Sequence, residues 1–169
     1  MPKPENGGTF TEVYDRYKSG VYHFCRRMVA DNDVAKDVVQ EVFIKYFENR
    51  ERLDGDTRIK VWLFKSARNR CLNYIRDRGK ISNIGDGGYE LPSPAITESE
   101  RIDSSDIIVK LFDDLPIDYR EILVMREWSE LSYGEIAETL DTTVSAVKSK
   151  LFKARKKASE IYKKFYGDE

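Results

Sequence analysis

The sequence has few of the residues that carry out chemistry in proteins. Its 169 residues include one histidine, His23, and two cysteines, Cys25 and Cys71, and neither cysteine stands in a CxxC or Cys/His spacing. There is no glycine-rich phosphate loop and no Ser/His/Asp set, since His23 alone would have to serve every proton transfer. These absences predict no catalytic residue, no metal site and no cofactor. We expect both cysteines to pack in a core and His23 to lie on a helix surface.

Long apolar runs are also missing. No stretch approaches the roughly 20 apolar residues that a membrane-spanning helix needs, and residues 1–8 lack the apolar core of a signal peptide. We therefore expect no membrane span and a cytoplasmic location.

The formal net charge is only −1, but the charges are unevenly distributed. Residues 57–80 contain 8 basic side chains and 1 acidic one, and residues 147–164 contain 8 and 1 as well. Two concentrated basic segments in an otherwise neutral chain favour two contacts with a polyanion. The alternative is that both are ordinary solvated helix faces.

Apolar periodicity predicts an all-α protein made of two small helical domains. Apolar residues at three-to-four spacing indicate helices over residues 10–30, 33–50 and 58–78, and shorter helices over 107–115 and 119–128. Residues 81–105 have no sustained apolar period and are rich in Gly, Pro, Ser and acidic residues, which indicates a flexible linker. We expect domains at 9–80 and 106–166, each with its own core and with a relative placement that the linker does not fix.

A helix-turn-helix is predicted near the C-terminus. Ser132 stands three residues before Glu135, which is the capping-box spacing at a helix start. Asp141 and Thr142 interrupt this helix, and Thr143 can cap a second one. The apolar residues expected to face inward are Ile136, Ala137, Leu140, Val144, Val147, Leu151 and Ala154. The alternative is a tight helical hairpin used only for packing.

Three motifs resemble the small, two-domain extracytoplasmic-function (ECF) sigma factors of the sigma-70 family. Residues 131–155 are similar to region 4, residues 37–43 to the polymerase-binding helix of region 2, and residues 62–69 to its promoter-melting segment. All three occur in family order and spacing. Asp141 stands where the family often has glycine, although aspartate tolerates unusual backbone angles better than most residues.

The resemblance implies a transcription initiation factor that directs core RNA polymerase to promoters by recognising minus-35 and minus-10 elements and promoting DNA melting. The candidates for the minus-35 element are outward or basic residues of the last helix: Ser145, Lys148, Ser149, Phe152, Lys153, Arg155 and Lys156. The candidates for the minus-10 element lie on the third helix: Arg58, Trp62, Phe64, Lys65, Arg68, Asn69 and Arg76. For Trp62 and Phe64 the alternative is a place in the hydrophobic core.

The resemblance also implies protein partners. The acidic face of the second helix would dock on the coiled coil of the polymerase's largest subunit, and the flap region of the polymerase would contact the chain too. The candidates for the coiled coil are Asp37, Gln40, Glu41 and Phe43. An ordinary solvated helix face is the alternative for this acidic stripe. The family further implies an anti-sigma factor as an inhibitor.

Two rival hypotheses remain at this point. An ordinary helix-turn-helix regulator would explain the second half of the chain but leaves the basic-aromatic and acidic faces of the first half without a task. An enzyme would require a substrate-sized cleft lined by perturbed carboxylates.

Overall fold

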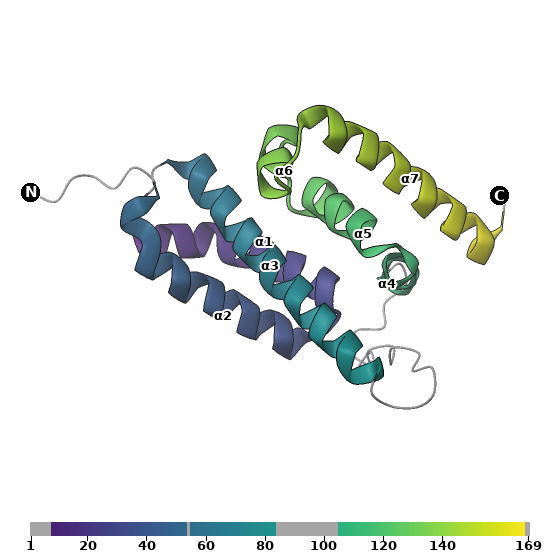
Figure 1. Cartoon of the computed structure of the whole chain (residues 1–169), viewed down its shortest axis with the longest axis horizontal. Helices are drawn as coiled ribbons and strands as arrows, with labels where there is room; N and C mark the ends of the chain where they lie inside the picture. The colour runs from purple at the N-terminus through teal and green to yellow at the C-terminus, as the bar shows by residue number, and fades with distance from the viewer. Residues whose placement is uncertain (1–7, 54, 84–104, 168–169) are drawn as a thin grey trace, which may run out of the picture.

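All regular structure in the described residues, 8–53, 55–83 and 105–167 of the computed structural model, is helical. Figure 1 shows the element order, in which α1 to α3 gather on one side and α4 to α7 on the other. The predicted all-α fold of two helical domains is confirmed. The helices are α1 (Phe10–Val29), α2 (Asn32–Asn49), α3 (Asp56–Asn83), α4 (Ser105–Asp114), α5 (Ile117–Leu123), α6 (Tyr133–Thr139) and α7 (Val144–Tyr166).

The N-terminal domain consists of α1, α2 and α3. Local sequence sets its helix ends: Thr9 and Glu12 form a capping box at the start of α1, and the carboxylate of Asp31 accepts hydrogen bonds from two backbone amides at the start of α2. A 3-10 turn over Arg50–Arg52 follows α2. Cys25 and Cys71 are fully buried between α1 and α3, as predicted, and both are free thiols. His23 lies on the exposed face of α1.

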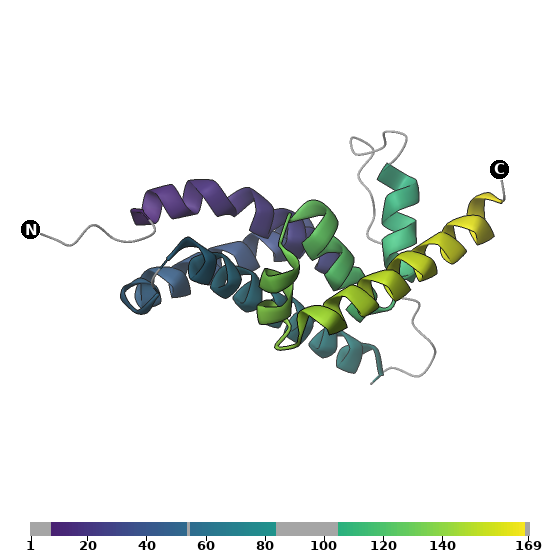
Figure 2. The same cartoon turned by 90° about the horizontal axis from the view of Figure 1, so that it is seen from above.

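The C-terminal domain consists of α4 to α7. Pro116 stands immediately before α5, where its fixed backbone angle suits a helix start. A π-helical turn over Val124–Trp128 continues α5. In Figure 2, α7 extends as a long straight rod along this domain, and its buried face carries Val147, Leu151, Ala154 and Ile161.

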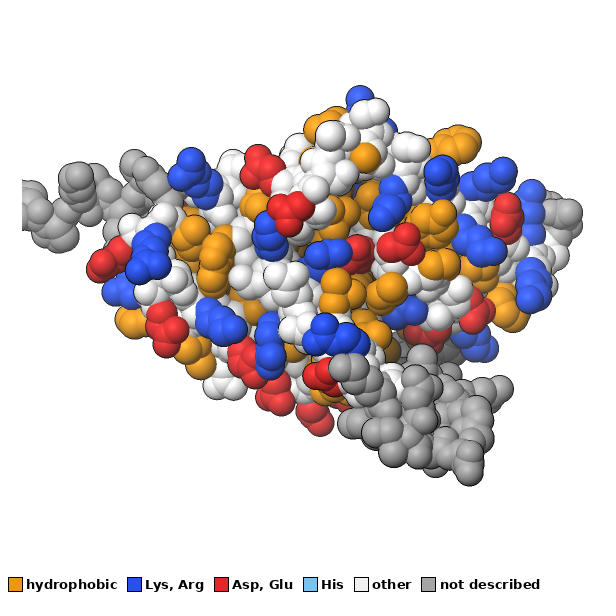
Figure 3. All heavy atoms as spheres, viewed as in Figure 1, with side chains coloured by type: hydrophobic (Ala, Val, Ile, Leu, Met, Phe, Trp, Pro, Cys, Tyr) orange, Lys and Arg blue, Asp and Glu red, His pale blue; other side chains and the backbone are white. Residues whose placement is uncertain are grey.

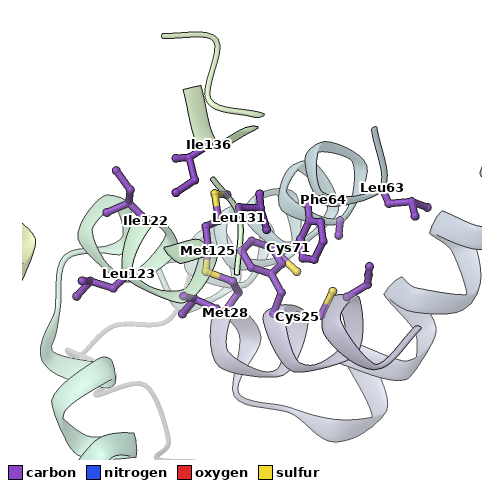
Figure 4. Packing of buried hydrophobic residues seen from close by; sticks show 14 of the residues in the cluster. Cys25, Met28, Leu63, Phe64, Cys71, Ile122, Leu123, Met125, Leu131 and Ile136 are labelled. Atoms are coloured by element: carbon purple, nitrogen blue, oxygen red, sulfur yellow. The ribbon is translucent and has the colours of Figure 1, made fainter. Parts of the chain in front are cut away.

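The two domains share one hydrophobic cluster, which corrects the prediction of two separate cores. Buried side chains from α1 and α3 pack with those from α5, the π-helical turn and α6. Figure 4 shows Met28 and Phe64 of the first domain close to Met125 and Leu131 of the second. Periodicity within one helix locates its apolar face but does not specify which other helix covers that face.

The predicted linker falls largely outside the described residues. Helix α3 continues to Asn83 and α4 begins at Ser105, so residues 84–104 of the proposed 81–105 segment are not described. Within the described ranges, no helix combines the length and the apolar character needed to span a bilayer.

Candidate nucleic-acid interface

The helix-turn-helix of α6 and α7 is built by the predicted local interactions. The hydroxyl of Ser132 accepts a hydrogen bond from the Glu135 amide at 3.1 Å, and the carboxylate of Glu135 accepts one from the Ser132 amide at 2.9 Å. Burial alone would raise the pKa of Glu135, but its hydrogen bonds with Ser132 and the charge of Lys60 hold the pKa below its usual value. Thr143 caps α7 by accepting a hydrogen bond from the Ala146 amide at 3.1 Å.

Asp141 lies in the turn between α6 and α7. Its φ of 52° lies in the left-handed region, which aspartate tolerates better than most residues. The next amide, that of Thr142, donates to the carbonyl of Ala137 at 2.9 Å and closes the end of α6. One apolar prediction here is wrong, because Val144, the first residue of α7, is 39% exposed instead of buried.

The outward face of α7 presents cations around an aromatic ring. Phe152 is 71% exposed although it is large and apolar. Figure 3 shows Lys and Arg side chains gathered over the part of the surface where α7 lies in Figure 1. All seven predicted residues of this helix are exposed: Ser145, Lys148, Ser149, Phe152, Lys153, Arg155 and Lys156.

Two of these cations already have neighbours within their own domain. Arg155 donates to the carboxylate of Glu127 at 2.8 Å and 3.3 Å, and this hydrogen bond raises the pKa of Arg155. Lys148 lies 5.7 Å from the ring centre of Tyr133. Lys153 and Lys156 are exposed further along the helix. The outward face of α7 therefore carries some cations that contact neighbouring side chains and others that are exposed to solvent. This arrangement suits contacts with DNA phosphates and base edges.

The predicted DNA-contacting residues of α3 fall into two groups in the structure, one exposed and one in contact with other parts of the protein. Arg58, Asn69 and Arg76 are exposed. Trp62 is half-buried, and its ring lies 6.1 Å from that of Tyr46, so it is partly a packing residue. These residues retain a basic and aromatic surface on one side of the helix.

Three other predicted residues of α3 contact other parts of the protein. Phe64 is 2% exposed and packs against Phe24, so the structure places it in the core and away from the surface that could meet DNA. Arg68 forms an ion pair with Glu121, and Lys65 forms one with Asp141. Both acidic partners belong to the C-terminal domain.

Only some of the predicted polymerase-contacting residues of α2 are accessible. Asp37 and Gln40 are exposed, whereas Phe43 is 3% exposed and lies in the core. Glu41 pairs with Arg70 of α3 at 2.5 Å. Asp37 and Gln40 are therefore the accessible members of the predicted set.

An apolar groove beside Gln40 was missed by the sequence analysis. It lies between α1 and α2 and has a volume of about 780 Å³, and its lining includes Tyr14, Gln40, Ile44 and Phe47. Ile44 and Phe47 are 54% and 49% exposed. The signal was present, because positions 40, 44 and 47 have the i, i+4, i+7 spacing that places them on one helix face.

Nothing in the described ranges groups three or more histidine, cysteine or acidic side chains in a way that could hold a metal ion. The Sigma-70 region 2 family matches residues 13–81, and the Sigma-70 region 4 family matches residues 105–157. Together these matches cover the three faces described above. The chain belongs to the sigma-70 family. It is an ECF sigma factor, a promoter-specific transcription initiation factor, and sigma factors are regulatory transcription factors rather than enzymes.

Similar proteins span nearly the whole of this sigma factor. The ECF RNA polymerase sigma factor SigM of Bacillus subtilis is 29% identical over 163 residues, which cover 95% of this chain and 99% of the relative. The ECF RNA polymerase sigma-E factor of Haemophilus influenzae is 32% identical over 158 residues, covering 86% and 83%. That of Escherichia coli K12 is 33% identical over 160 residues, covering 86% and 82%.

Two solved structures share the fold of this sigma factor. The sigma factor RpoE in complex with the anti-sigma factor NepR, from Bartonella quintana, has a TM-score of 0.76 and 25% identity, covering 91% of this chain and 96% of that one. CnrH in complex with the cytosolic domain of CnrY has a TM-score of 0.67 and 20% identity, covering 90% and 86%.

Proposed function

We propose that this sigma factor divides promoter recognition between its two basic helices and performs no covalent step itself. Residues 106–166 bind the minus-35 element through α7, and residues 9–80 bind and help to melt the minus-10 element through α3. The observation that carries this proposal is the difference between the two faces. Helix α7 follows a helix-turn-helix and presents exposed cations for a duplex groove, whereas α3 presents an amide and cations beside a half-buried tryptophan, which suits a single strand.

The exposed part of α2 is proposed to dock on core RNA polymerase in the cytoplasm. Asp37 and Gln40 would meet a basic coiled coil of the largest subunit, and the apolar groove containing Ile44 and Phe47 would bury apolar side chains beside them. In such an interface the charges mainly speed and orient the encounter, and the apolar contacts supply much of the affinity.

Charge reversal on α2 tests this docking surface. Asp37→Lys combined with Gln40→Ala is expected to weaken binding to core RNA polymerase by at least about tenfold, while binding of the free chain to DNA stays unchanged. The matched control is Glu138→Lys, which makes the same change of charge at an exposed position of α6, a helix that does not line the groove. Affinity for purified core polymerase is the measurement, and equal affinities for the two variants would contradict the assignment.

An anti-sigma factor is proposed as a further partner. This proposal is supported by the titles of the two structures above, one of which names an anti-sigma factor bound to a sigma factor. The groove on α1 and α2 and the basic faces of α3 and α7 are the surfaces that such an inhibitor would need to cover. Affinity purification of the chain from its native host, without an inducing treatment, would recover an inhibitor with it, and recovery of the chain alone would count against this partner.

A further inference from the structure

The groove between α1 and α2 runs along two antiparallel helices. The ring centre of Phe10 lies 5.3 Å from that of Phe47, and the ring centre of Tyr14 lies 4.9 Å from that of Phe43. Because positions rise along α1 as they fall along α2, Tyr22 lies across the groove from the first turns of α2. Helix α1 rises about 18 Å between positions 10 and 22, so the groove is elongated and has two distinct ends.

The two ends of the groove carry opposite charges. Glu48 lines the aromatic end, whereas Lys18 and Lys36 line the end near Tyr22. Both lysines are exposed. Lys18 contacts the carboxylate of Asp15 at 3.2 Å, but both side chains of this pair are exposed, and exposed pairs contribute little. Both ammonium groups can therefore meet an anion that enters the groove.

The size and lining of the groove suit a small ligand. Sites for small molecules typically have volumes of about 300 to 1,000 Å³ and are mostly apolar, with a few polar groups that fix the orientation of the ligand. The groove has a volume of about 780 Å³ and apolar walls that include Tyr14, Val39 and Phe43. A cationic end that continues into an aromatic channel matches an unbranched alkyl chain with a terminal carboxylate.

We propose that the groove binds a fatty acid. The carboxylate lies at Lys18 and Lys36, and the alkyl chain runs past Phe43 towards Phe47. The opposite orientation would bring the carboxylate next to Glu48, so the charges of the groove select one direction.

A bound fatty acid would cover the surface of α2 that is proposed to dock on core RNA polymerase. Gln40 and Ile44 line the same groove, so the alkyl chain and the apolar side chains of the polymerase would compete for it. Binding of the fatty acid does not depend on the proposed function, whereas this competition rests on it. At ten times its Kd, the fatty acid should weaken polymerase binding about tenfold.

Binding of octanoate, decanoate and dodecanoate to the free chain tests the site. Isothermal titration calorimetry is carried out below the concentration at which each compound forms micelles. Each methylene that enters the groove should raise the affinity at least about twofold, since complete burial of one would raise it about fourfold. Dodecylammonium has the same chain with the opposite charge and should bind at least about tenfold more weakly than dodecanoate.

Removal of the two cations tests the head-group contact. Lys18→Gln with Lys36→Gln should weaken dodecanoate binding about fivefold and should not weaken binding of dodecylammonium. The matched control, Lys45→Gln with Lys110→Gln, makes the same change of net charge at two exposed positions that do not line the groove. Its affinity for dodecanoate should stay within about twofold of that of the unmodified chain.

Replacement of the exposed apolar wall tests the chain contact. Ile44→Ser with Phe47→Ser should weaken dodecanoate binding at least about tenfold and flatten its dependence on chain length. The two side chains are 54% and 49% exposed, so we expect the fold to be retained, as thermal unfolding would show. If the double variant unfolds, Ile44→Ser alone should still lower the affinity at least about threefold.

Three results would overturn the proposed ligand site: no saturable binding of dodecanoate, equal losses in the two lysine double variants, or unchanged binding in the Ile44 variant. Polymerase binding that depends on Ile44 and Phe47 without any binding of fatty acid would assign the groove to a protein partner alone. If dodecanoate binds as predicted but polymerase affinity is unchanged in its presence, the ligand site stands and the proposed docking of polymerase on the groove is contradicted.

Discussion

Replacing Lys148 and Lys153 with alanine is expected to weaken binding of the polymerase holoenzyme to its promoter at least about tenfold. Both side chains are exposed on the outward face of α7, one near its N-terminus and the other in its middle. Each lost phosphate contact should also lower the salt slope of duplex binding by about 0.9. Filter binding or fluorescence anisotropy with a promoter fragment, repeated at several salt concentrations, measures both effects.

The control for this experiment removes two lysines from other parts of the same helix. Lys150 pairs with Asp118, and Lys164 lies beyond the residues that match the region 4 family. Lys150→Ala with Lys164→Ala makes the same change of charge, so it should leave the affinity nearly unchanged. If both double variants lose affinity equally, the effect comes from net charge and not from the proposed face.

Replacing Asn69 with alanine is expected to leave promoter binding largely intact and to reduce promoter melting by roughly tenfold. Asn69 is exposed on α3, and its amide can hydrogen-bond to an unpaired base or phosphate. Permanganate reactivity of unpaired thymines in the open complex measures the melting. Trp62 is a poorer probe, because its packing against Tyr46 means that its removal would also loosen the N-terminal domain.

The two substitutions serve as controls for each other. The α7 variant should bind the promoter poorly, and the small fraction of promoter DNA that it does bind should melt. The α3 variant should bind the promoter but fail to melt it. Thermal unfolding of both proteins should match that of the unmodified chain. Normal melting by the Asn69 variant together with normal binding by the Lys148 and Lys153 variant would show that both faces are wrongly assigned.

Much of the fold follows from short-range rules in the sequence. Apolar spacing located the main helices, and the hydroxyl and carboxylate of Ser132 and Glu135 marked the start of α6 because each satisfies a backbone amide that the helix leaves free. Asp141 adopts the left-handed angle that its position in the turn requires.

The features that the sequence did not predict depend on which helix surfaces pack against one another. Trp62 and Phe64 are two positions apart on a helix and so point about 200° away from each other. The family motif assigned both to DNA, but the fold can expose at most one of them, and it buries Phe64. The ion pairs that join α3 to the C-terminal domain link residues more than 50 positions apart, and no local pattern in the sequence predicts them.

The most direct test of the account is transcription in a purified system. Promoters are first identified as the shared upstream motif of genes induced when the protein is overproduced in its host. Core RNA polymerase is then supplied with this chain as its only sigma factor on those templates. The account predicts transcripts that begin at discrete positions downstream of the motif. Binding of the chain to these promoters with no transcripts above those of core polymerase alone would contradict it and would favour an ordinary helix-turn-helix regulator.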